Sequence, residues 1–297
     1  MLRRLSDLAN QPLARHVAGG LTLLGGLFAG YALQIEPRWP EIVRLELPLP
    51  NLPRQFDGLT LVQISDLHAG AAFPSTLIRR SVDLVNAFGA DMIAITGDLF
   101  QSTPQDARMC AEALSALRAP LGVYLVMGNH ERRIAPEYGE KPFRRPEFCL
   151  LCNAAHRLAV DGASLWLVGV DDVLMRLGDL GSALRGVPPE ACKILLVHEP
   201  DFADQIVRST RTAAPACGPI DLQLSGHTHG GQVRLPGVGP LLLPVLGRRY
   251  PMGLYRLNGM WLYTNRGLGV APPPVRLFCR PEITLFTLRN KDAAAGC

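Results

Sequence analysis

Five short apolar runs, widely separated in the chain, each end in residues that are able to bind a metal ion. In chain order, these residues are Asp66 and His68, Asp98, Asn129 and His130, His198, and His227 and His229. Five of the seven histidines of the chain occur at these points. Open α/β sheets place their ligand sites in the loops beyond the strand ends. The pattern therefore predicts that the five ends converge on one site.

Between these points the chain alternates between short apolar runs and amphipathic segments, which is typical of an α/β fold. The pattern predicts strands at residues 59–65, 91–96, 122–127, 164–169, 193–197 and 221–225, and helices at residues 75–87 and about 104–117. With 297 residues, of which 48% are hydrophobic, the chain can bury a sizeable core.

Charge and cysteine content exclude some classes of protein. The formal net charge of +4 is compatible with an enzyme that handles anions, but the sequence lacks the basic stripe of a nucleic-acid binder, so no nucleic-acid partner is expected. Seven scattered cysteines do not form the pattern of a disulfide framework. The C-x-x-C pair Cys149 and Cys152 could bind zinc or act in redox chemistry, but its apolar surroundings favour two small buried side chains.

The amino terminus differs from the rest of the chain. Residues 17–35 are uncharged, rich in leucine and glycine, and preceded by Arg3, Arg4 and Arg15. This run predicts an uncleaved transmembrane signal-anchor helix, with a cleaved signal peptide as the alternative. The positive-inside rule then places residues 1–16 in the cytoplasm and the catalytic domain outside it, at the cell (inner) membrane.

The remaining boundaries follow from composition. Residues 36–57 contain five prolines and predict an extended connector. The main domain is expected at residues 58–289, followed by a short tail at residues 290–297.

In order and rough spacing, the five motifs resemble the calcineurin-like metallophosphoesterases. The motifs are Asp66-x-His68, Gly97-Asp98, Gly128-Asn129-His130-Glu131, His198 and Gly226-His227-x-His229. Three further segments are similar to the bacterial, membrane-associated YkuE/YaeI-like branch of that superfamily: Gly169-Val170-Asp171-Asp172, the run ending at Pro200, and Gly267-Leu268-Gly269.

The resemblance implies an α/β fold with a two-sheet β-sandwich core flanked by helices. It also implies two divalent metal ions, one held by Asp66, His68 and His229 and the other by Asn129, His198 and His227, with Asp98 bridging them. Mixed imidazole and oxygen ligands suit Mn²⁺, Fe or Zn²⁺. His130 is expected to act on the substrate as a catalytic residue without being a primary ligand. Glu131 and Asp172 are either outer-sphere groups of the metal site or surface carboxylates.

The expected function is hydrolysis of a phosphomonoester or phosphodiester by a metal-activated hydroxide. Basic residues after the catalytic segment (Arg132, Arg133, Lys141, Arg144 and Arg145) either contact phosphate or form a solvated face. The apolar residues 240–246 are either core or a surface that meets lipid, so a lipid-linked substrate is conceivable. A UDP-2,3-diacylglucosamine pyrophosphatase of lipid A synthesis is the alternative enzyme. The alternative without activity is a membrane-tethered binding module.

Overall fold

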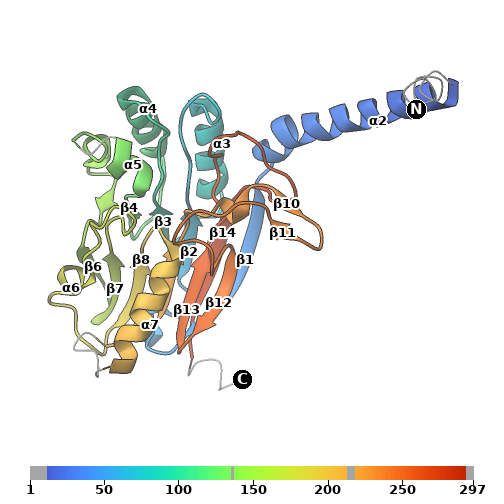
Figure 1. Cartoon of the computed structure of the whole chain (residues 1–297). Coiled ribbons are helices and arrows are strands. Elements are labelled where there is room, and N and C mark those ends of the chain that lie inside the picture. The colour runs from blue at the N-terminus through green and yellow to red at the C-terminus, as the bar shows by residue number, and fades with distance from the viewer. Residues whose placement is uncertain (1–11, 135–136, 213–217, 292–297) are drawn as a thin grey trace.

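The computed structural model describes residues 12–134, 137–212 and 218–291, and it contains two six-stranded mixed sheets packed face to face (Figure 1). In spatial order, the first sheet comprises β1 (Glu41–Leu49), β14 (Glu282–Asn290), β2 (Thr60–Ile64), β3 (Met92–Thr96), β4 (Val123–Val126) and β5 (Cys149–Leu150). The second comprises β12 (Gly253–Leu257), β13 (Met260–Thr264), β9 (Leu222–Ser225), β8 (Cys192–Leu196), β7 (Ala163–Gly169) and β6 (Ala154–Val160). Strands β10 (Arg234–Leu235) and β11 (Gly239–Pro240) form a separate hairpin.

Helices lie outside both sheets: α3 (Ser75–Asn86), α4 (Pro104–Leu114), α5 (Asn129–Ile134), α6 (Leu180–Ala183) and α7 (Ala203–Thr212). A further helix, α2 (Pro12–Gly30), covers neither sheet (Figure 1). Alternate residues of a strand face opposite sides of its sheet. In β3, Ile93 and Ile95 therefore join the core under α3 and α4, whereas Met92 and Ala94 join the core between the sheets. The predicted α/β fold with a two-sheet core flanked by helices is confirmed.

The six predicted strands are found within one residue of their predicted ends. Strands β2, β3 and β4 run parallel to one another, and so do β7, β8 and β9. Parallel strands end at the same edge of a sheet, so this topology gathers the loops after the carboxyl ends of the strands in each sheet.

The segment predicted as a connector belongs to the folded domain. Residues 41–49 form β1, which pairs in parallel with β14 along its whole length. Leu47, Leu49, Leu52 and Phe56 are buried in the core between the sheets. The prolines correctly predicted an extended chain, but the alternating apolar residues among them form the inward face of a strand.

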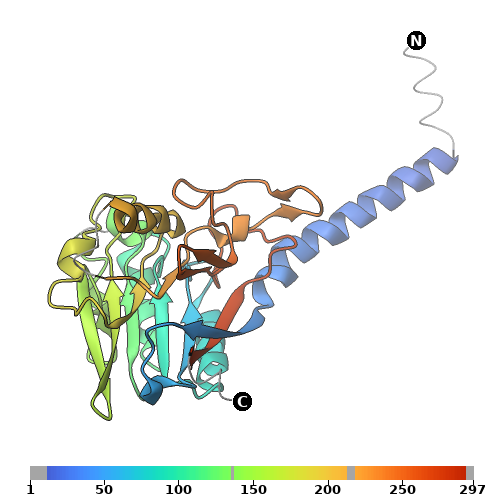
Figure 2. The same cartoon turned by 90° about the horizontal axis from the view of Figure 1, so that it is seen from below.

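The predicted anchor is helical, but a transmembrane span is not supported. Helix α2 projects away from the domain, and the π-helical turn at Tyr31–Ile35 joins it to the domain (Figure 2). Ala32 in this turn is buried, and its carbonyl accepts a hydrogen bond from the backbone N–H of Arg276, so part of the predicted span is occupied by contacts with the domain. Within the described residues no helix has both the length and the apolar character needed to cross a membrane. Residues 1–11 of the predicted cytoplasmic segment and residues 292–297 of the predicted tail lie outside the described residues.

We expect Leu47→Ala to lower the free energy of unfolding by roughly 2–5 kcal/mol, because it removes a fully buried side chain from the core between the sheets. Glu46→Gln, on the exposed side of the same strand, is the control and should change it by less than about 1 kcal/mol. Urea unfolding of both variants measures the difference. Equal small effects would show that residues 41–49 are a linker outside the cooperative fold.

Candidate metal centre

The structure brings all eight residues singled out in the sequence to one place. Three overlapping groups have side-chain ligand atoms within 4.8 Å of one another: Asp66, His68 and His229; His68, Asp98 and His130; and Asp98, His198 and His227. Asn129 lines the same cavity as His68, Asp98 and His130. The prediction of one convergent site is thus confirmed in its geometry.

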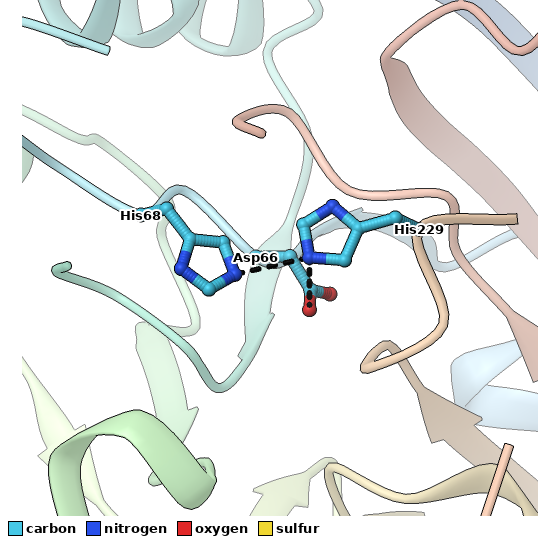
Figure 3. A group of neighbouring side chains, drawn as sticks. All are labelled: Asp66, His68 and His229. Atoms are coloured by element: carbon cyan, nitrogen blue, oxygen red, sulfur yellow. Dashed lines mark hydrogen bonds and ion pairs between the residues drawn. The ribbon is translucent and has the colours of Figure 1, made fainter. Parts of the chain in front are cut away.

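The first group joins the two sheets (Figure 3). Asp66 and His68 follow β2, whereas His229 follows β9 of the other sheet. His68 Nε2 lies 3.0 Å from His229 Nε2, and His229 Nε2 lies 3.4 Å from Asp66 Oδ1. Two nitrogens that bind the same tetrahedral ion at about 2.1 Å are themselves roughly 3.4 Å apart, so this spacing suits two ligands of one ion.

The second group lies on the other side of Asp98. His198 Nε2 is 3.2 Å from His227 Nδ1. Asp98 Oδ2 lies 3.3 Å from His198 Nε2 and 3.5 Å from His68 Nε2, so one carboxylate oxygen contacts both groups. Asp98 is therefore the residue that connects the two clusters.

The orientation of two imidazoles is fixed by carbonyl groups behind them. His198 Nδ1 donates a hydrogen bond to the Thr96 carbonyl at 2.7 Å, so Nε2 is the nitrogen that faces Asp98. His227 Nε2 donates to the Val245 carbonyl at 2.8 Å, which leaves Nδ1. In both rings the remaining nitrogen points into the cluster.

The backbone at the site is held in an uncommon conformation. Asp66, His68, Asp98, His227 and His229 all have φ between 45° and 72°, the left-handed region that non-glycine residues rarely occupy. Such strain persists where the surrounding structure enforces it, and it is frequent at functional sites. Two glycines make the crowding possible. A Cβ on Gly128 would lie 2.3 Å from Asp98 Oδ1, and one on Gly226 would lie 2.2 Å from Asp66 Oδ2.

Burial keeps three of the imidazoles neutral. It lowers the pKa of His68 to about 3 and that of His227 to about 4, and it holds the pKa of His229 well below its ordinary value. Burial opposes the charge on Asp98, but the neighbouring His198 holds the pKa of that carboxyl well below its usual range. The site therefore offers imidazole lone pairs beside a carboxylate, as metal binding requires.

An unpaired oxygen supports the same interpretation. The amide oxygen Oδ1 of Asn129 is buried and accepts no hydrogen bond from the described residues. Such an atom is costly unless it has a partner, and a cation would provide one. Together with the imidazole and carboxylate donors, it completes a mixed oxygen and nitrogen set that fits Mn²⁺, Fe or Zn²⁺.

His130 occupies a different position from the other histidines. Its ring meets that of His68 edge-on at 4.5 Å, its backbone N–H donates to Asp98 Oδ1 at 2.9 Å, and its Nδ1 donates to the Gln101 carbonyl at 3.2 Å. It is only partly buried and lines the cavity. Its Nε2 is thus the nitrogen that remains for a bound molecule.

The cavity at the cluster has a volume of about 470 Å³ and two kinds of lining residue. One kind includes Asp98, Asn129 and four of the histidines, namely His68, His130, His227 and His229. The other kind, which we call the apolar wall, comprises Val233, Leu241, Leu242, Leu243, Pro244, Ala271, Pro272, Pro273 and Val275.

Arg132, Arg144 and Arg145 have other partners. Arg132 donates to both carboxylate oxygens of Asp171 at 2.7 Å and also pairs with Glu140. Arg144 pairs with Glu140 as well, and Arg145 pairs with Glu147. None of the five basic residues suggested for phosphate contact lines the cavity. Arg132 follows the catalytic segment in the sequence, but its ion pair with Asp171 turns its guanidinium to a partner other than a bound phosphate.

Two supporting residues stand out behind the site. Glu131 is fully buried and its carboxylate accepts hydrogen bonds from the backbone N–H groups of Asp98, Leu99, Phe100 and Gly128. The sequence left open whether Glu131 is structural or exposed, and these contacts decide the question.

Arg276 was not identified from the sequence. It is fully buried behind His229, where its guanidinium donates to the carbonyls of Arg266, Gly267, Gly269 and Cys279.

Comparisons with known proteins agree with this geometry. The family model for calcineurin-like phosphoesterases matches residues 59–231. The uncharacterized metallophosphoesterase YkuE of Bacillus subtilis is 34% identical to this chain over 93% of its length and 94% of the relative. A Danio rerio transmembrane protein with a metallophosphoesterase domain is 31% identical over 90% of this chain and 62% of that protein.

Two other relatives carry names that describe an activity. The phosphodiesterase YaeI of Escherichia coli is 30% identical over 87% of this chain and 92% of that protein. A more distant relative is the UDP-2,3-diacylglucosamine pyrophosphatase LpxG of Chlamydia muridarum, with 26% identity over 86% of this chain and 91% of that protein. The chain belongs to the calcineurin-like phosphoesterase family and is a phosphoester hydrolase.

Proposed function

We propose that this chain hydrolyses a phosphomonoester or phosphodiester in a site that holds two divalent metal ions. The observation that carries the proposal is the position of Asp98, whose one carboxylate oxygen lies within 3.5 Å of a histidine in each of two ligand clusters. Divalent ions supply Lewis acidity, which acidifies water and offsets the charge that develops on the phosphoryl oxygens.

The ligand sets proposed for the two ions each draw on both sheets. Asp66, His68 and His229 would hold one ion, and Asn129, His198 and His227 the other, with Asp98 shared. The carbonyl contacts of His198 and His227 favour this assignment, because they orient the lone pair of each ring toward the cluster.

His130 is proposed as the residue that acts directly on the substrate. It faces the cavity beside His68 and Asp98, and its Nδ1 is already committed to the Gln101 carbonyl. Its Nε2 would protonate the leaving oxygen or donate a hydrogen bond to the phosphoryl group as negative charge develops.

A second candidate activity is cleavage of a lipid-linked pyrophosphate such as a UDP-diacylglucosamine. The apolar wall favours it, because it lines the same cavity as His68, Asp98 and Asn129 and could hold an acyl chain. The similarity to LpxG supports the same class of substrate. Association with a membrane is part of this proposal, and the Danio rerio relative named as a transmembrane protein supports it.

The metal-loaded protein should be assayed against a panel of phosphomonoesters, phosphodiesters and UDP-diacylglucosamine. We expect hydrolysis of at least one simple ester, loss of this activity with a chelator, and recovery on addition of Mn²⁺ or Zn²⁺. A protein that holds two metal ions and is inactive on the whole panel would contradict the enzymatic proposal and favour the binding-module alternative.

His130→Ala should lower kcat by about 10²–10⁴-fold while the protein keeps both metal ions, because the residue acts on substrate and is not a primary ligand. Elemental analysis of the purified variant gives the metal content, and steady-state kinetics give the rate. His156→Ala is the matched control, since His156 packs against Tyr124 away from the cavity. Loss of both metals from His130→Ala would refute this division of roles.

Glu131→Gln should lower the free energy of unfolding by about 2–4 kcal/mol. Each carboxylate oxygen of Glu131 accepts hydrogen bonds from two backbone N–H groups. In glutamine one of these oxygens becomes an NH₂ group, which is a donor and cannot accept the hydrogen bonds from its two N–H partners. Metal content should fall as well, because Glu131 holds the backbone N–H of Asp98, the proposed shared ligand. Thermal and denaturant unfolding measure the effect against Glu147→Gln, at an exposed glutamate. Wild-type stability and metal content in Glu131→Gln would rule out this supporting role.

A further inference from the structure

Exposed apolar side chains are concentrated on one part of the molecule. Among the described residues, sixteen large hydrophobic side chains are exposed; seven lie between Leu23 and Trp39, five lie between Leu235 and Val245, and Phe278 is a further member. Only Met175, Leu177 and Leu254 lie elsewhere. Contiguous apolar surface of this kind marks a site of interaction in a soluble domain.

These segments are neighbours in space. The rings of Phe28 in α2 and Phe278 are 6.0 Å apart. Phe278 in turn lines a surface hollow together with the hairpin residues 234–239. Helix α2 and the β10–β11 hairpin project from the same side of the domain in both views (Figures 1 and 2). We call the exposed residues of 23–39, those of 235–245 and Phe278 the apolar rim.

The charged residues that flank the apolar rim indicate what kind of partner it binds. Residues 235–246 contain no charged side chain, but Arg234 precedes them and two arginines follow, the exposed Arg248 and Arg249, which pairs with Asp204. Val238 and Leu242 are 73% and 82% exposed, the highest values among the large hydrophobic residues. An apolar segment flanked by basic residues is typical of structures that enter the headgroup region of a membrane, where arginine contacts lipid phosphates.

The apolar rim is continuous with the cavity of the candidate metal centre. Leu241 and Leu242, which follow the hairpin, belong both to the apolar rim and to the apolar wall of the cavity. Leu243 and Pro244 continue that wall. An acyl chain lying along these residues would occupy the same cavity as His68, His130 and Asp98.

We propose that the apolar rim docks on the surface of a lipid bilayer that contains anionic lipids, and that the cavity takes an amphiphilic phosphoester from that bilayer. The docking surface stands independently of the catalytic proposal, whereas the substrate class rests on the proposed function. The hairpin, and not α2 alone, is assigned as a membrane-contacting element.

The test uses flotation of the full chain with phosphatidylcholine vesicles prepared with and without phosphatidylglycerol. We expect the wild-type chain to bind more strongly to the anionic vesicles. The double variant Leu235→Asp/Val238→Asp should bind at least about tenfold more weakly, because it places two charges on the hairpin outside the cavity. The matched control Met175→Asp/Leu177→Asp, at exposed apolar residues elsewhere, should bind like the wild type. Both variants should hydrolyse water-soluble bis(p-nitrophenyl) phosphate at the wild-type rate.

Equal vesicle binding by the hairpin variant and the control variant would overturn the docking proposal. So would sedimentation showing that the wild-type chain self-associates through the hairpin without vesicles, because the apolar rim would then be an interface between two copies.

The substrate class has a separate test. Leu242→Asp should lower kcat/KM for a phosphodiester carrying an acyl chain by a larger factor than it lowers kcat/KM for bis(p-nitrophenyl) phosphate, since Leu242 is on the apolar wall. Equal losses on the two esters would overturn the assignment. If the proposed function itself fails, neither ester is hydrolysed while vesicle binding persists, so the two failures are distinguishable.

Discussion

The carboxylate of Asp98 links the loops of the two sheets at the candidate metal centre. It follows β3 of the first sheet, yet it contacts His198 of the second sheet and holds the backbone N–H of His130. Its own N–H is fixed by the buried Glu131, which ties the loops after β3 and β4 together. Both proposed ligand sets combine residues from the two sheets, so bound cations would also cross-link the sandwich. Packing of the core between the sheets and the chemistry of the site thus depend on each other.

The sequence predicted the strands that carry the site better than the rest of the sheets. Strands β2, β3, β4, β8 and β9 are short apolar runs that stop at polar residues, which makes them easy to recognise. Strand β1 was missed because the five prolines of residues 36–57 suggested a connector. Only its pairing with β14, more than 230 residues later, reveals it as a strand. The sequence could not show which N–H groups Glu131 would hold, nor that Arg132 would pair with Asp171, because both depend on loops brought together by the fold.

The amino-terminal helix has a closer relation to the site than the sequence indicated. In the π-helical turn that follows it, the Ala32 carbonyl accepts a hydrogen bond from the backbone N–H of Arg276, and Glu36 accepts hydrogen bonds from the N–H groups of Phe278 and Cys279. Cys279 in turn donates to the His229 carbonyl. The segment that supports α2 is therefore packed directly behind one of the proposed ligands. Phe278 of the apolar rim belongs to the same segment, so the proposed membrane contact and the proposed metal site share a structural element.

Anomalous X-ray scattering from crystals grown with Mn²⁺ or Zn²⁺ would test the central claim most directly. We expect two peaks, one among Asp66, His68 and His229 and one among Asn129, His198 and His227, with Asp98 contacting both. A single peak, or a second one away from Asn129, His198 and His227, would contradict it.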